Sequence, residues 1–207
     1  MHRILRLIPP FTGERAGRQM KTDAIRTRRF TAIILGYPFA LMAIATLVNL
    51  GFTGIRPLAV GLPTTPVLAA LILSALLLLA NHTWLMTSTE LARLRYGMQA
   101  TPEEWAESGG TPGDIAPEGH AELQRRHNAH RNATENSVIF AVLAGAMVLS
   151  SPAPLAAQIW MIGFAIGRLG HSYGFLSGQA GLRGGFMSVS LTALYGMAGY
   201  LLLALVF

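Results

Sequence analysis

The sequence predicts an all-α integral membrane protein, and three observations lead to this fold class. Hydrophobic residues make up 52% of the 207 residues and charged residues only 13%, whereas an ordinary soluble domain carries about 25% charged residues. The mean hydropathy is +0.43. Apolar runs of about 20 residues, the length of helix that crosses the hydrocarbon core of a bilayer, recur along the chain. A soluble globular domain does not fit this composition.

Four apolar runs approach or exceed the length of a membrane span, at residues 30–52, 66–86, 155–175 and 186–207. A fifth run, residues 138–149, is too short to span alone. A helix that begins at or before Asn128 would lengthen it to about 22 residues, which suffices at about 1.5 Å per residue. We therefore expect a basic cytoplasmic tail (1–29), one extra N-terminal transmembrane helix (30–53) and a four-helix membrane domain (66–207).

The positive charges predict which way the helices run. Eight Lys or Arg residues precede the first span, and a cytoplasmic N-terminus places seven more on the cytoplasmic side, which leaves Arg56 alone outside. The positive-inside rule therefore predicts a multi-pass protein with a cytoplasmic N-terminus and an external C-terminus, in the inner membrane if the organism is bacterial. Membrane lipids are expected partners of the basic tail. Nucleic acid is not, because the basic residues follow a membrane face and form no recognisable binding motif.

The chain contains no cysteine. This absence excludes a disulfide scaffold, a thiolate metal site and a cysteine nucleophile. Any thiol chemistry must therefore use the thiol of a second molecule.

The substantial polar loop, residues 101–118, begins with the string TPEEW. Thr101 suits the N-cap of a helix and Pro102 its first position, and the two glutamates that follow suit the positive first turn. We expect a short helix here.

A polar stripe precedes the short apolar run. Arg131 and Glu135 are four residues apart and Asn132 adjoins them, so the three side chains lie on neighbouring positions of one helix. A salt bridge between Arg131 and Glu135 at the start of a helix is one interpretation. The other is a binding site, because a guanidinium, an amide and a carboxylate together can hold a small zwitterion with carboxylates, an ammonium and peptide groups.

A second polar cluster lies inside an apolar run. Arg168 and His171 share a helix face, and an ionisable residue at a helix centre in the membrane costs about 2.5–3.5 kcal/mol on insertion scales, which makes it a candidate functional residue. The alternative is that Arg168 snorkels to the inner interface. Arg183 follows in a Gly-rich turn, where it is either a ligand contact or a plain interfacial charge.

These strings together resemble the MAPEG family, the membrane-associated proteins in eicosanoid and glutathione metabolism. The resemblance rests on His130-Arg131-Asn132-x-x-Glu135, then Arg168-x-x-His171, then Arg183 after the Gly-rich turn. The segment TSTELARLRYGMQATPEEW, with Arg93 and Glu104, is similar to the family's first-helix end and following loop. The resemblance covers about residues 66–207. It implies a four-helix bundle, assembled as a homotrimer, with glutathione bound between neighbouring subunits.

The resemblance also implies roles for individual residues. Glutathione, as co-substrate, would be bound by Arg93, Arg131, Asn132, Glu135 and His171, together with Arg168. Arg183 would lie nearest the sulfur as the catalytic residue. A free thiol with a pKa near 8.5 is mostly protonated at neutral pH, and a nearby cation stabilises the thiolate. The implied function is a membrane-embedded glutathione-dependent transferase or peroxidase that acts on a hydrophobic electrophile.

Two departures from the family pattern leave other functions open. Phe175 stands where many family enzymes carry a tyrosine, and Gly184 stands in place of a serine. These changes favour a non-catalytic membrane binder of glutathione or a lipid within the same family. A third possibility is a metalloenzyme that uses His127, His130, Glu135 and His171. No metal is expected, because the neighbouring arginines create a positive field that opposes cation binding.

Overall fold

The computed structural model describes the backbone of residues 13–207 and the side chains from Arg26 onward. Every regular element in this part of the chain is helical. In order, the elements are α1 (Gly13–Val48), η1 (Asn49–Thr53), α2 (Thr65–Tyr96), α3 (Pro102–Ser108), η2 (Pro112–Asp114), α4 (Pro117–Leu149), α5 (Pro154–Ala157), η3 (Gln158–Ile162), α6 (Gly163–Leu176) and α7 (Ala180–Val206).

The all-α membrane fold is confirmed. Four helices within the described residues are long and apolar enough to cross a membrane: Arg26–Thr53, Thr65–Tyr96, Pro117–Leu149 and Ala180–Val206. The remaining expected span, residues 155–175, is helical throughout but is divided into α5, η3 and α6, because residues 158–162 form a π-helical turn. Helix α4 begins at Pro117, well before Asn128, so the short apolar run does belong to a long helix.

The N-terminal helix begins earlier than the sequence patterns indicated. Helix α1 starts at Gly13 and not near Phe30, so much of the expected tail is helical. The physical reason is that residues 13–29 contain no proline and are rich in Arg, Lys, Gln, Met and Ala, which favour helix. Residues 1–12 of that tail lie outside the described residues. Two compact units divide the chain, Met1–Ala40 and Leu41–Phe207.

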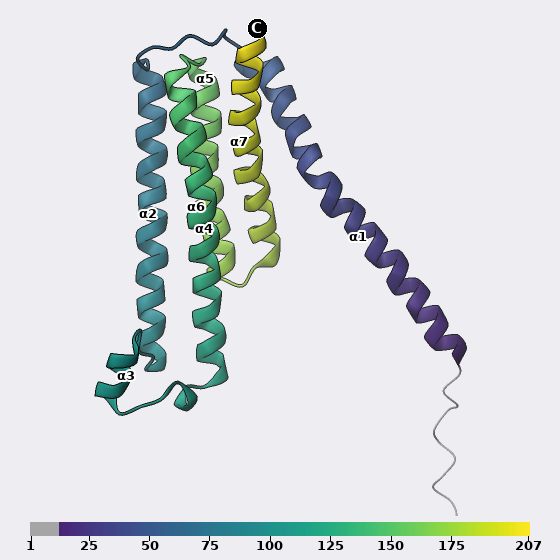
Figure 1. The fold of residues 1–207 in the computed structure, drawn as a ribbon, viewed down its shortest axis with the longest axis vertical. Coiled ribbons are helices and arrows are strands. Elements are labelled where there is room, and N and C mark those ends of the chain that lie inside the picture. Colours follow the sequence, from purple (N-terminus) through teal and green to yellow (C-terminus); the bar gives the residue numbers. More distant parts are fainter. Residues whose placement is uncertain (1–12) are drawn as a thin grey trace, which may run out of the picture. The chain divides into compact units, whose positions relative to one another are not determined.

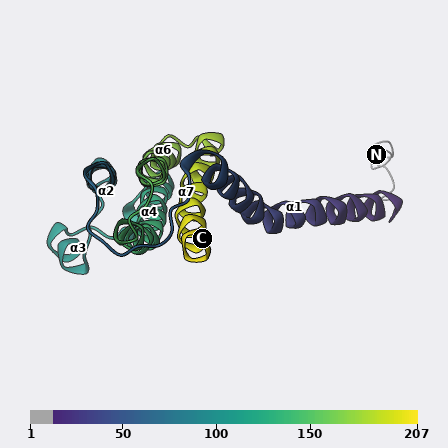
Figure 2. The ribbon, with the colours of Figure 1, turned by 90° about the horizontal axis from the view of Figure 1, so that it is seen from above.

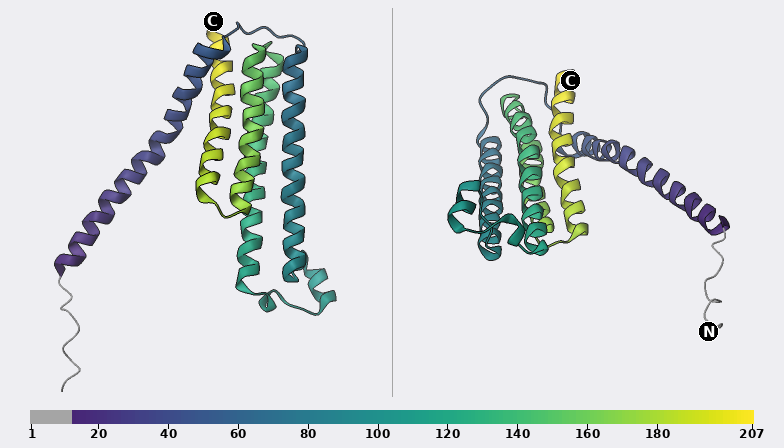
Figure 3. Two further views of the ribbon diagram at one scale, coloured as in Figure 1. Left: turned by 180° about the vertical axis from the view of Figure 1, so that it is seen from behind. Right: turned by 60° about the horizontal axis from the view of Figure 1, so that its bottom comes forward.

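The second unit is a bundle of α2, α4, α7 and the continuous helical segment 154–176 (Figure 1). Seen from above, α4 and α6 lie between α2 and α7 (Figure 2). The core contains Phe140, Met147, Trp160 and Met197, and the rings of Phe140 and Phe164 stack with centroids 4.5 Å apart. Both α2 and α4 extend past the turn that joins α6 to α7 (Figure 3).

A buried asparagine connects η1 to the bundle. Asn49 is 0% exposed, its Nδ2 donates to the backbone carbonyl of Gly196 at 2.9 Å, and its Oδ1 accepts from Trp160 Nε1 at 2.8 Å. Because both amide groups are satisfied, this polar side chain is compatible with a membrane interior. The segment that follows α1 is thereby fixed to α7 and η3.

Glycines on α6 let the backbone of α7 approach closely, and this close contact fixes the position of the first turns of α7. A Cβ added to Gly174 would lie 2.5 Å from the backbone N of Arg183, and one added to Gly167 would lie 2.7 Å from the backbone N of Ser190. Small residues at such contacts are typical of packed membrane helices. The connecting turn contains Gly178 at φ +70°, a left-handed conformation that glycine adopts without strain.

Candidate functional site

The predicted site residues lie on four helices, toward the end of the bundle where α6 turns into α7. Helix α2 carries Arg93 near its C-terminal end, and α7 carries Arg183 in its first turn. The others are Arg131, Asn132 and Glu135 on α4, and Arg168 and His171 on α6. This end of the bundle is the lower end in Figure 1.

Arg168 is buried and forms a hydrogen bond with Asn132. Its side chain is 0% exposed, and its Nη2 donates to Asn132 Oδ1 at 2.6 Å. Its Nη1 lies 3.4 Å from Ser190 Oγ and 3.5 Å from Met187 Sδ. Within the described residues this guanidinium has no carboxylate partner, and its Nε makes no hydrogen bond. Arg168 therefore does not snorkel to the interface; it connects α6 to α4 and α7.

His171 and Arg183 are joined across the turn between α6 and α7. His171 Nδ1–H donates to the backbone carbonyl of Arg183 at 2.8 Å. A carbonyl only accepts, so the proton belongs on Nδ1. The Arg183 guanidinium lies over the Phe175 ring, 4.9 Å from its centroid, which is a cation–π arrangement. Phe175 in turn meets the His171 ring edge-on, with centroids 5.1 Å apart. These three side chains form one cluster.

Arg131 and Glu135 are exposed on α4 and do not pair with each other. Neither side chain has an ion-pair partner in the part of the chain that the structure describes. The alternative of a mutual salt bridge therefore does not hold in this structure. Both charged groups are accessible to a ligand or to a second protein chain.

Positive charge is in excess at this end of the bundle. Arg93 pairs with Glu90 at 3.1 Å, and Arg126 pairs with Glu122. Three arginines of the predicted site have no carboxylate within 4.0 Å among residues 26–207: Arg131, Arg168 and Arg183. Unpaired guanidinium groups attract carboxylates and other anions.

His130 and His171, two of the residues considered as metal ligands, have different neighbours. His130 Nε2 lies 3.3 Å from His82 Nδ1, while His171 is engaged with the backbone of Arg183 on another pair of helices. Within the described residues no group of three or more His, Cys, Asp or Glu side chains is placed to hold a metal ion. The set of four residues considered for a metalloenzyme does not come together here.

The match to a known family covers this site. A model of the MAPEG family matches residues 67–203, which is more than half of the chain. The chain belongs to the MAPEG family. No curated protein matches it. All seven predicted site residues lie inside the MAPEG match, whereas α1 and η1 precede it. Membership makes this a membrane protein of glutathione or eicosanoid metabolism in general.

Some contacts around the candidate site were not anticipated from the sequence. Ser190 and Met187 approach Arg168 from α7, and the backbone carbonyl of Ser88 accepts a hydrogen bond from Arg126 Nε at 2.7 Å. The spacing of Gly167, Gly170 and Gly174 on one face of α6 was the signal available for the α7 contacts, because small residues three and four apart mark a face that another membrane helix approaches closely.

Proposed function

We propose that this MAPEG protein is a membrane-embedded glutathione-dependent transferase or peroxidase that acts on a hydrophobic electrophile. The observation that carries the proposal is the group of unpaired arginines on α4, α6 and α7 within the family match. Glutathione carries carboxylates, an ammonium group, peptide groups and a thiol. Guanidinium groups bind carboxylates through charge-assisted hydrogen bonds, so an arginine-rich site with an amide and a single free carboxylate has matching chemistry.

The proposed roles follow from how each side chain is held. Arg131 binds a glutathione carboxylate and Glu135 its ammonium group, because both side chains are exposed and unpaired. Asn132 contributes its amide N–H groups, since its Oδ1 is already bonded to Arg168. Arg168 acts through Asn132, and Arg93 and His171 complete the binding groups.

Arg183 is the proposed thiolate stabiliser. It is exposed and lies in the first turn of α7, where the helix dipole also favours a negative charge. Each unit by which the thiol pKa of bound glutathione is lowered requires about 1.4 kcal/mol of preferential thiolate stabilisation. A guanidinium and a helix N-terminus both lower the pKa of a nearby thiol.

A non-catalytic binder of glutathione or a lipid is the second candidate, and one observation favours it. The Arg183 guanidinium lies over the Phe175 ring, and neither Phe175 nor Gly184 carries a hydroxyl group that donates to a thiolate. Activation would then rest on Arg183 alone.

We also propose a homotrimer, in which the exposed Arg131 and Glu135 of one protomer meet a ligand shared with its neighbour.

Glutathione binding and turnover by the detergent-purified protein test the proposal. Calorimetry with glutathione and with S-methylglutathione measures binding with and without a free thiol, and an aryl halide and a lipid hydroperoxide serve as electrophiles. An enzyme binds both peptides and consumes one of the electrophiles at a saturable rate. Binding without turnover supports the non-catalytic binder of glutathione. No binding at millimolar glutathione contradicts both the enzyme and the glutathione binder, and only the lipid binder is then left.

A further inference from the structure

An aromatic ring supports the charged end of the Arg183 side chain. The guanidinium lies over the ring of Phe175, with its Cζ 4.9 Å from the ring centroid. Within the described residues this guanidinium has no ion-pair partner, and the hydrogen bonds of Arg183 there are made by its backbone. Because an arginine side chain has many rotamers, the position of its charge depends on the contact with this ring.

The backbone of Arg183 is fixed by other residues of α6. Its carbonyl accepts from His171 Nδ1 at 2.8 Å, and a Cβ added to Gly174 would lie 2.5 Å from its N. These contacts set where the Arg183 side chain begins, and Phe175, on the same helix, sets where it ends.

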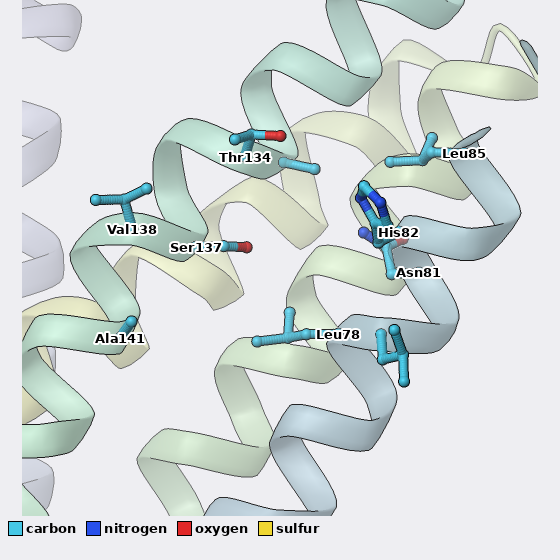
Figure 4. Close-up of a pocket in the computed structure, with 10 residues that line it drawn as sticks. Leu78, Asn81, His82, Leu85, Thr134, Ser137, Val138 and Ala141 are labelled. Atoms are coloured by element: carbon cyan, nitrogen blue, oxygen red, sulfur yellow. The ribbon is translucent and has the colours of Figure 1, made fainter.

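The Phe175 ring is itself held by α2 and α4. It packs against the buried cluster of Leu85, Ala129 and Ala133. Leu85 and Ala133 also line the pocket between α2 and α4 (Figure 4), so these two helices lie close together at this level. The His171 ring meets Phe175 edge-on, with centroids 5.1 Å apart. A ring confined in this way offers the guanidinium a negative face at a fixed place.

A contact of this kind leaves the hydrogen-bonding capacity of the guanidinium free. The attraction acts between the positive charge and the negative face of the ring, and it uses none of the five N–H donors. Those donors stay available for an anion. Phe175 has no hydroxyl group and cannot donate to a thiolate itself, so any contribution that it makes to the thiolate passes through Arg183.

We propose that Phe175 is a positioning residue, which holds the Arg183 guanidinium beside the sulfur of bound glutathione and thereby stabilises the thiolate. This inference rests on the proposed role of Arg183 as the thiolate stabiliser. The cation–π contact orders Arg183 before glutathione binds, so less of the interaction with the thiolate is lost to ordering the side chain.

Fluorinated phenylalanines at position 175 test this role, because ring fluorines weaken the negative face of the ring and nearly keep its shape. The full chain is prepared with mono-, di- and trifluorophenylalanine at this position, and the pKa of the bound glutathione thiol is measured from the thiolate absorbance. We expect this pKa to rise stepwise with fluorination, by about half a unit to one unit in the trifluoro protein. The affinity for S-methylglutathione, which has no free thiol, should stay within about twofold of the parent value.

Trifluorophenylalanine at Phe164 is the matched control. Phe164 lies on the same helix and stacks on Phe140, and no cation lies over its ring in the described part of the chain. Its fluorination should leave the thiol pKa at the parent value. An equal rise in the Phe164 control overturns the specific role of Phe175.

Thermal unfolding without glutathione tests the contact separately. The parent, Phe175→Leu, Arg183→Leu and the double variant form a double-mutant cycle. The midpoint should fall less in the double variant than the two single falls together, because both changes remove the same contact; additive falls overturn it. A thiol pKa that is unchanged or lower across the fluorine series, in proteins that still bind glutathione, overturns the positioning role and leaves the proposed function intact. Failure of the parent to bind glutathione overturns the proposed function and this role with it.

Discussion

At the scale of single residues, the contact between Arg168 and Asn132 explains how a guanidinium is kept inside a membrane bundle without a carboxylate. A hydrogen bond to a charged group contributes about 1.5–3 kcal/mol, roughly twice the neutral case. The sequence predicted Arg168 as unusual because a charge inside an apolar run is visible locally. Its partner was not predictable, because Asn132 is 36 residues away in the chain and only the packing of α6 on α4 brings the two together.

The first prediction follows from this contact. Asn132→Leu removes the oxygen that accepts from Arg168, so the free energy of unfolding should fall by about 1.5–3 kcal/mol. Asn132→Asp keeps an acceptor and adds a counter-charge, and should retain stability. Asn136→Leu is the control, since Asn136 bonds only to the backbone carbonyl of Asn132. Thermal unfolding in detergent, followed by helical circular dichroism, measures all three. An equal loss of stability in Asn132→Leu and Asn136→Leu would show that the Arg168 contact contributes no more to the free energy of unfolding than the hydrogen bond of Asn136 does.

At the scale of elements, the pair of α6 and α7 places both His171 and Arg183. Apolar runs of sufficient length predicted the two helices, because such a run is a local signal. The π-helical turn at Gln158–Ile162 and the start of α1 at Gly13 were not predicted. The turn contains Trp160, which bonds to Asn49 across 111 residues, and such a distant contact leaves no periodic signal in the sequence.

The second prediction concerns the closest approach of these helices. Gly174→Ala places a Cβ 2.5 Å from the backbone N of Arg183, so α7 must shift, at a cost of about 1–3 kcal/mol for an overpacked contact. The midpoint of thermal unfolding should fall, and the hydrogen bond from His171 to the Arg183 carbonyl should lengthen. Gly185→Ala in the same α7 is the matched control, because nothing lies within 4 Å of its added Cβ. If the two variants unfold at the same temperature, the close approach of α6 to α7 does not require a glycine at position 174.

The third prediction concerns the cap of α3. The expected N-cap is confirmed: Thr101 and Glu104 form a capping box. The pKa of the Glu103 carboxyl is lowered by a hydrogen bond from its own backbone N–H and by a second from the Thr101 side chain. A lowered pKa in the folded state means that this contribution to stability is present above the pKa of the unfolded chain and is lost as pH falls through the folded value. An NMR titration of Glu103 should show a midpoint below the ordinary value for Glu, and Thr101→Val should raise it. An unchanged midpoint in Thr101→Val would show that the Thr101 hydroxyl does not contribute.

At the scale of the whole molecule, backbone hydrogen bonds place the start of α2 and the C-terminal ends of α4 and α7 at the same end of the bundle. The backbone N–H of Leu58 donates to the carbonyl of Ala204 at 2.8 Å, and that of Gly61 donates to Leu149 at 3.2 Å. The loop before α2 therefore lies beside the C-terminal ends of α4 and α7. This arrangement is compatible with helices that alternate in direction across the membrane. The orientation of that path stays a prediction from the positive charges.

The fourth prediction tests that direction. A reporter that is active only outside the cytoplasm should be active when fused after Phe207, because 14 of the 16 Lys and Arg residues then lie on the cytoplasmic side, with Arg168 buried inside the bundle and Arg56 external. A reporter inserted at Gly110, between α3 and η2, should be cytoplasmic and serves as the internal control. The reverse pattern for both reporters contradicts the assigned orientation.

The proposed role of Arg183 as the stabiliser of the glutathione thiolate is tested by the near-ultraviolet absorbance of that thiolate. Glutathione is added to the purified parent protein and to Arg183→Leu over a range of pH, with S-methylglutathione as the blank. The account predicts that the parent forms bound thiolate at a lower pH than free glutathione does, that Arg183→Leu needs a higher pH, and that turnover falls further than binding. Thiolate formation at the same pH in both proteins would contradict it.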